Sequence, residues 1–143
     1  VILGDGATHP DRTVASGSIT LARSVQKAHI GFNYKSTLQT MRIDAGGTEG
    51  TSQGKNKRIN NITLRLYKSV GVKVGSSEAE LDLIPFRSSA DDMSQALDMF
   101  TGDKEVEFRG GYDNDGFVFV RQDQPLPLTV LAIFPRLQTF DQW

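Results

Sequence analysis

The chain has 143 residues, of which 38% are hydrophobic and 23% are charged, a composition typical of a folded protein rather than a disordered one. Its 16 Lys and Arg residues and 17 Asp and Glu residues give a formal net charge of -1, which argues against a dedicated nucleic-acid binder. A chain of this length is expected to form a single domain, residues 1–143, around one core.

The composition also excludes several kinds of chemistry. Without cysteine the chain has no disulfide, no thiolate metal site and no cysteine nucleophile. The longest apolar run, residues 126–134, is about half the ~20 residues that a membrane-spanning helix needs, so no membrane insertion is expected. The chain opens with VILGDG rather than with Met, and we expect it to be a fragment of a longer protein.

Short segments rich in β-branched and aromatic residues, separated by turn residues, predict strands along most of the chain. In chain order, and apart from a longer segment described below, they are residues 18–21, 28–34, 37–43, 81–83, 105–109, 117–121 and 128–134. Together they predict an all-β, mainly antiparallel fold, a β-sandwich or barrel-like domain with at most one short helix.

Residues 45–61 are rich in Gly, polar and basic residues and predict a long loop, which is usually functional or mobile. Lys55, Lys57 and Arg58 place three positive charges close together, so they are the candidate contacts for phosphates or an acidic partner. A solvated charge cluster is the alternative interpretation. The segment GTSQGKN does not match a phosphate-binding loop, because Asn56 stands where that motif needs a hydroxyl, and no cofactor is expected.

The clearest periodic signal lies in residues 62–74, where every second residue is apolar. This alternation predicts a strand, or two strands joined at residues 69–71, with one face on a core and the other in water or at an interface. The apolar positions are Ile62, Leu64, Leu66, Val70, Val72 and Val74, and the positions between them include Thr63, Arg65, Tyr67, Ser69 and Lys73.

Residues 90–100 contain the single helical pattern in the sequence. Met93, Leu97 and Phe100 are spaced to share a helix face, and Ser89 precedes Asp92 as in a capping box. The alternative is a surface loop laid over the core by its Met and Phe side chains.

The segment RGGYDNDG separates Phe108 from Phe117 and contains an Asp115-Gly116 pair, which suits a turn with positive φ. We therefore predict that the flanking segments form an antiparallel hairpin. A turn is favoured over a calcium loop, because Gly111 occupies the first ligand position.

Residues 128–134 are apolar at both odd and even positions, as in a strand covered on two sides. Such a strand would lie centrally in a sandwich or against a neighbouring subunit. Pro125, Pro127 and Pro135 bracket it, because proline cannot donate a hydrogen bond to a sheet.

No residue is assigned a catalytic, cofactor-binding or metal-binding role. His9 and His29 are far apart in the chain and make no recognisable metal site. No Ser, His and Asp grouping has the form of a motif, although such groups also assemble from distant segments.

Several segments, taken in order, resemble the C-terminal part of bacteriophage tail proteins, and are most similar to the tail nozzle, or tail tubular B-type, proteins of short-tailed phages. The most specific are DGATHPD, GKNKRI leading into RLYKSVGVKVG, and RQDQPLPLTVLAIFPRL. The resemblance covers nearly the whole chain. It fails at SSADDMSQALDMF, where the family leads us to expect a more proline-rich extended stretch.

The resemblance implies a virion structural protein of the phage tail with no enzyme activity. Its partners would be other copies of itself, in a hexameric ring of the full-length protein, other tail proteins, and genomic double-stranded DNA in transit. A host-surface or carbohydrate-binding β-module is the alternative, for which Tyr34, Tyr112 and Trp143 would have to form a platform. A hydrolase with a site assembled in space is a third hypothesis.

Overall fold

The computed structural model describes residues 1–45, 50–93 and 95–140, and these residues form strands, turns and loops without a helix. Every strand pair is antiparallel, so the predicted fold class is confirmed. The strands are β1 (Ile2–Gly4), β2 (Ala7–His9), β3 (Ala28–Ile30), β4 (Ser36–Gln39), β5 (Asn56–Ser69), β6 (Lys73–Gly75), β7 (Leu81–Leu83), β8 (Phe100–Glu107), β9 (Phe119–Gln122) and β10 (Val130–Phe140).

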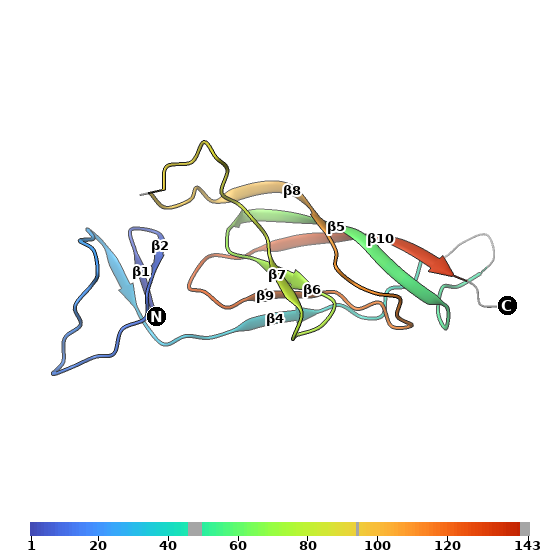
Figure 1. The fold of residues 1–143 in the computed structure, drawn as a ribbon, viewed down its shortest axis with the longest axis horizontal. Helices are drawn as coiled ribbons and strands as arrows, with labels where there is room; N and C mark the ends of the chain where they lie inside the picture. The colour runs from blue at the N-terminus through green and yellow to red at the C-terminus, as the bar shows by residue number, and fades with distance from the viewer. Residues whose placement is uncertain (46–49, 94, 141–143) are drawn as a thin grey trace.

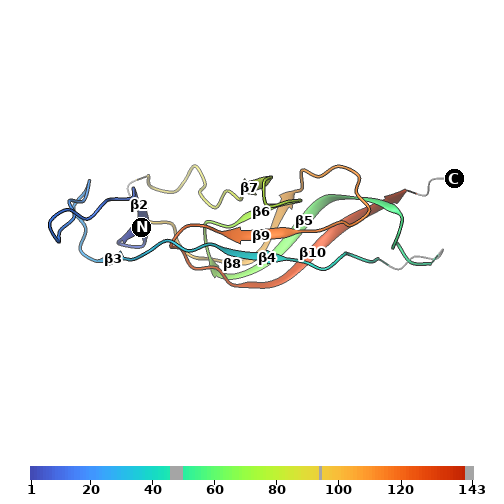
Figure 2. The same ribbon diagram turned by 90° about the horizontal axis from the view of Figure 1, so that it is seen from below.

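The strands form three sheets, with the orders β2-β1-β3, β10-β5-β8 and β4-β9-β6-β7. The small β2-β1-β3 sheet lies at one end of the elongated molecule, and an extended connection joins β3 to β4 (Figure 1, Figure 2). The other two sheets pack face to face as the layers of a β-sandwich.

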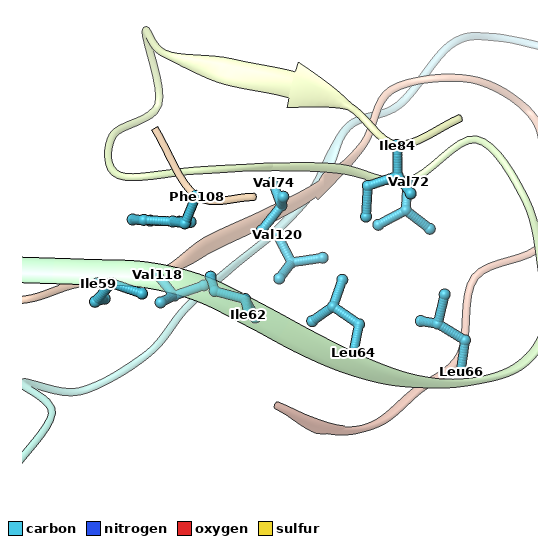
Figure 3. Close-up of a cluster of buried hydrophobic side chains, with 10 residues drawn as sticks. All are labelled: Ile59, Ile62, Leu64, Leu66, Val72, Val74, Ile84, Phe108, Val118 and Val120. Atoms are coloured by element: carbon cyan, nitrogen blue, oxygen red, sulfur yellow. The ribbon is translucent and has the colours of Figure 1, made fainter. Parts of the chain in front are cut away.

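The core lies between these two layers and is built by alternate residues of their strands (Figure 3). In a strand successive side chains point to opposite faces, so the period-two pattern of residues 62–74 aims its apolar set at the opposite sheet. All six apolar positions of that pattern are buried, as predicted. The buried cluster consists of Ile59, Ile62, Leu64, Leu66, Val72, Val74, Ile84, Phe108, Val118 and Val120.

The alternating segment is two strands, one in each layer, and not one continuous strand. β5 ends at Ser69 and the chain turns at Gly71, whose φ of 72° suits glycine. Ser69 belongs to the polar set of the sequence pattern but is buried, and its hydroxyl accepts a hydrogen bond from Thr129 N at 2.8 Å and donates to Tyr67 O. The apolar residues before the turn therefore line the core from one sheet, and those after it line the core from the other.

Several predicted strand boundaries are corrected. Residues 18–21 do not form a strand, since Ser18 only makes an isolated bridge with Ala15. The predicted strands 28–34 and 37–43 shrink to β3 and β4, whereas 81–83 is confirmed as β7. Residues 105–109 and 117–121 overlap β8 and β9. β5 begins six residues earlier than expected, so its first residues lie inside the predicted loop 45–61. Residues 46–49 of that loop lie outside the described part of the chain.

The hairpin predicted around RGGYDNDG is wrong, although Gly116 has the expected positive φ of 61°. β8 pairs with β5 in one sheet, whereas β9 pairs with β4 and β6 in the other. Between them Asp113 and Lys57 exchange backbone hydrogen bonds of 2.9 Å. The connection therefore crosses between the layers instead of folding back on β8.

The described parts of the predicted helix 90–100 are turns and extended chain. Ser88 N donates a 2.6 Å hydrogen bond to the Asp91 carboxylate, a bond of the capping-box kind, but no helical turn follows it in the described residues. The surface-loop alternative fits better, although Met93 is exposed. Phe100 begins β8 and packs on Phe86, with ring centroids 5.8 Å apart.

The apolar strand of residues 128–134 does not lie centrally in the sandwich. β10 is an edge strand that pairs with β5 alone, and it runs on to Phe140. Leu131 and Phe134 are exposed, so the chain by itself covers one face of the strand. Pro135 lies inside β10 opposite Ile62, which an edge strand tolerates because one side of its backbone has no strand to pair with.

Candidate interaction surface

The solvent-facing side of the β10-β5-β8 sheet, here called the outer face, carries exposed aromatic side chains. Arg65 and Tyr67 of β5 alternate with core residues and therefore face away from the core. Phe134 of β10 pairs with Thr63 and lies on the same face. Tyr67 and Phe134 are each 46% exposed. Exposed aromatic groups gathered on one sheet face are typical of surfaces that contact another molecule.

An ion pair orders the middle of the outer face. The Arg65 guanidinium donates hydrogen bonds of 2.7 and 2.8 Å to the two carboxylate oxygens of Asp103, and it lies 5.2 Å from the centroid of the Phe134 ring. The hydrogen bond from Arg65 holds the pKa of Asp103 below its usual value, and the same bond raises the pKa of Arg65. Because both side chains are solvent-exposed, the pair positions Arg65 over Phe134 more than it stabilises the fold.

A row of carboxylates follows β8 along the outer face. Asp103, Glu105 and Glu107 alternate along the strand and are exposed. Glu105 accepts a hydrogen bond of 3.0 Å from the side-chain amide of Asn61. The row was not predicted, although the segment DKEVE already places these acids at alternate positions.

The predicted contact residues Lys55, Lys57 and Arg58 do not form one surface cluster. Lys57 and Arg58 are neighbours on β5 and therefore point to opposite faces of the sheet. Arg58 is exposed on the outer face, with its guanidinium 5.9 Å from the centroid of the Tyr112 ring. Lys55 is partly buried. A contact role for Lys55 and Arg58 stays a prediction.

Lys57 is 2% exposed and does not present its charge on the surface, against the expectation from the sequence. Its ammonium donates a hydrogen bond of 3.0 Å to Ile43 O. Its aliphatic stem packs against Gly116, where an added Cβ would lie 2.7 Å from Lys57 Cδ. The residue therefore ties the start of β5 to the chain segments beside it.

Asp44 organises the described part of the long loop. Its carboxylate accepts hydrogen bonds from the hydroxyl of Ser52 at 2.8 Å, from Thr51 at 2.9 Å and from Ser52 N at 2.9 Å. These bonds, with the Ser52 hydroxyl foremost, hold the pKa of Asp44 below its usual 3.8. Asp44 is thereby tied to Thr51 and Ser52, shortly before the start of β5.

The aromatic residues expected of a carbohydrate platform do not meet. Tyr34 lies exposed in the connection between β3 and β4. Tyr112 packs edge-on against Phe140 at the end of β10, with ring centroids 5.2 Å apart. These segments lie at different ends of the sandwich (Figure 1), and Trp143 lies outside the described residues.

The histidines have structural positions. His9 is buried, its Nδ1 lies 2.8 Å from Pro10 O, and its Nε2 accepts a hydrogen bond of 2.9 Å from Ala22 N. His29 is exposed on β3.

Within residues 1–45, 50–93 and 95–140, no three His, Asp or Glu side chains are grouped so as to hold a metal ion, and no helix there could span a membrane. Comparison of the sequence with protein-family models and with curated proteins finds no match.

Proposed function

We propose that the chain is a structural domain of a bacteriophage tail, of the nozzle or tube type. Several copies of its parent protein surround the channel through which genomic double-stranded DNA leaves the capsid. The resemblance of the segments DGATHPD, RLYKSVGVKVG and RQDQPLPLTVLAIFPRL to such proteins supports the assignment. In this proposal the domain acts by assembly, and its partners are other copies and other tail proteins.

The exposed outer face is the observation that carries the proposal. Leu131, Phe134 and Phe140 of β10 and Tyr67 of β5 are about half exposed in the isolated chain. Covering the exposed half of such a side chain contributes about 1 kcal/mol, so four of them give a contact of modest strength. A modest contact is sufficient in a closed ring, because each copy is held by two neighbours at once.

The test is the location of the chain in the virus particle. Antibodies raised against the 143-residue chain are applied to intact particles of the phage that encodes it, and bound antibody is located by electron microscopy. We expect label at the tail, at or near its tip. Label on the capsid, or on no particle although the epitopes are accessible in disrupted virions, would refute the assignment.

Glycan binding separates the proposal from a carbohydrate-binding module. The dispersed positions of Tyr34 and Tyr112 give no stacking platform in the described residues, so we expect no shift of the melting temperature with host-surface sugars. A saturable increase in melting temperature with one sugar would favour the binding module.

A further inference from the structure

Residues 1–31 form a unit of their own at one end of the molecule, here called the end unit. It consists of the β2-β1-β3 sheet and the loop between β2 and β3. Every hydrogen bond and ion pair that its residues make within the described part of the chain stays inside the unit. Examples are the bonds of 3.0 and 2.8 Å from Gln26 N and Lys27 N to the Asp5 carboxylate. The end unit is therefore held together by its own polar contacts.

The apolar contacts of the end unit are likewise separate from the main core. Ile2 is 2% exposed, but it does not belong to the buried cluster between the two large sheets. Val25, in the loop, packs against β1, since a Cβ added to Gly4 would lie 2.7 Å from Val25 Cγ1. The main core thus ends before the end unit begins.

The end unit meets the sandwich beside Ala96. A Cβ added to Gly6, in the turn between β1 and β2, would lie 3.5 Å from Ala96 Cβ, in the segment before β8. Openings of about 270 Å³ and 370 Å³ adjoin this contact, and Ala7 and Ala96 line both of them. Close-packed protein interiors contain few voids larger than a water molecule. The end unit therefore rests on the sandwich without interlocking with it.

The sandwich surface below the end unit is mainly apolar. From the end unit, the turn residues 6–8 reach the opening of 270 Å³. From the sandwich, the apolar side chains that line it include Val70, Leu83, Phe86, Leu97 and Leu126. Leu83 is 57% exposed even with the end unit in place. This surface needs a cover, and the cover that the structure shows is an end unit.

Residues 32–35 join the end unit to β4 and are here called the hinge. They run as an extended connection along one side of the molecule (Figure 1, Figure 2). All four are exposed, Phe32 fully so, and they make no hydrogen bond within the described part of the chain. Four extended residues span up to about 13 Å. Rotation about the hinge therefore breaks no hydrogen bond, whether in the hinge or between the end unit and the sandwich.

From these observations we propose that neighbouring copies of the chain exchange their end units, so that the end unit of one copy covers the apolar surface beside Ala96 of the next. The exchanged contact is the same contact that the structure shows within one chain, so no new complementarity is required. In an isolated chain its own end unit has the highest local concentration and closes. Where copies are held side by side, as the proposed function requires, the end unit of a neighbour competes at similar local concentration, and the inference rests on that function.

The first experiment locks the end unit on its own sandwich. The chain has no cysteine, and the Cβ separation between positions 6 and 96 is one that a disulfide accepts. Gly6→Cys/Ala96→Cys is oxidised in dilute solution, and its self-association is measured by sedimentation velocity up to millimolar concentration. The oxidised chain should stay monomeric, whereas the reduced chain should associate at least about tenfold more tightly, because only its end unit can leave.

The second experiment detects exchange between copies. Chains with Gly6→Cys alone and chains with Ala96→Cys alone are mixed at equal millimolar concentrations and oxidised, and the disulfide-linked pairs are measured by mass spectrometry. Exchange should raise the ratio of mixed to identical pairs at least about fivefold above that of random collision. The matched control replaces Ala96→Cys by Gly111→Cys, in the connection between β8 and β9, where an added Cβ meets no atom within 4 Å; it should give the random ratio.

A third variant needs no cysteine. Deleting residues 32–33 shortens the hinge, so the end unit no longer reaches its own sandwich, and the chain should associate at lower concentration than the wild type. Equal association of the oxidised and reduced chains, a random ratio in the mixture, or a shortened hinge that leaves the chain monomeric would each overturn the inference. Particle labelling decides the proposed function separately, since exchange in solution without label at the tail removes the phage role and keeps the exchange.

Discussion

Replacing Leu64 by Ala tests whether the two large sheets share one core. Leu64 is fully buried in the centre of β5 and points toward Val120 of β9 in the opposite sheet (Figure 3). The change removes three buried carbon atoms, at ~0.8 kcal/mol each, and the cavity that remains raises the total loss of folding free energy to ~3–4 kcal/mol. For a chain of this length that loss lowers the melting temperature by about 10 °C.

The assay is chemical denaturation followed by circular dichroism, with Leu131→Ala as the matched control. Leu131 is 59% exposed on β10, so the same chemical change should cost less than about 1 kcal/mol. Both variants should unfold in one cooperative step, because β5 and β9 belong to one hydrophobic cluster.

Two results would refute the reasoning. A loss below about 1.5 kcal/mol for Leu64→Ala would mean that the facing sheet does not enclose the side chain. Separate transitions would mean that the sheets fold independently. A double-mutant cycle with Val120→Ala gives a further check, since residues that touch across the core should show a coupling energy of ~0.5 kcal/mol or more.

Three further changes probe the rest of the molecule. Gly75→Ala should destabilise by ~2–3 kcal/mol, because the new Cβ would lie 1.7 Å from Glu80 O, whereas Gly111→Ala, which meets no atom within 4 Å, should be neutral in the same thermal unfolding assay. Lys57→Met should keep the melting temperature within a few degrees, because Met still fills the space of the buried stem, whereas Lys57→Ala should lower the free energy of unfolding by ~2 kcal/mol or more. Equal losses of stability in the two variants would show that the charge of Lys57 matters more than its stem. The pKa of Asp44 is lowered in the folded state, so its hydrogen bonds stabilise the fold fully above pH 3.8 and lose their effect as the pH falls through the folded pKa. The difference in melting temperature between wild type and Asp44→Asn should therefore be constant near neutral pH and vanish in acid. A difference that grows on acidification would contradict this sign.

The sequence alone determined the class of the fold and the orientation of its central strands. Period-two alternation has one structural meaning, because a strand turns successive side chains to opposite faces. For this reason Ile62, Leu64 and Leu66 could be assigned to the core, and Val72 and Val74 followed by the same argument. The positive φ of Gly116 was also predictable, since it depends on local sterics.

The partners of each strand were decided only by the tertiary structure. A turn at Gly116 is compatible with a hairpin and with a crossing between layers. Which one forms depends on whether pairing of β8 with β9 or with the distant β5 gives the lower free energy, and β8 pairs with β5. In the same way, apolar residues on both faces of β10 indicate two covered faces but not which molecule covers them. The structure makes β10 an edge strand and leaves its second face open.

The candidate surfaces show the same division. Three basic residues within four positions were visible in the sequence, yet strand geometry buries Lys57 and exposes Arg58, because neighbours on a strand face opposite ways. The acids of β8 are ordinary charges when read along the chain. They form a row at the edge of a sheet only because the fold makes β8 the last strand of the β10-β5-β8 sheet and turns alternate residues to one face.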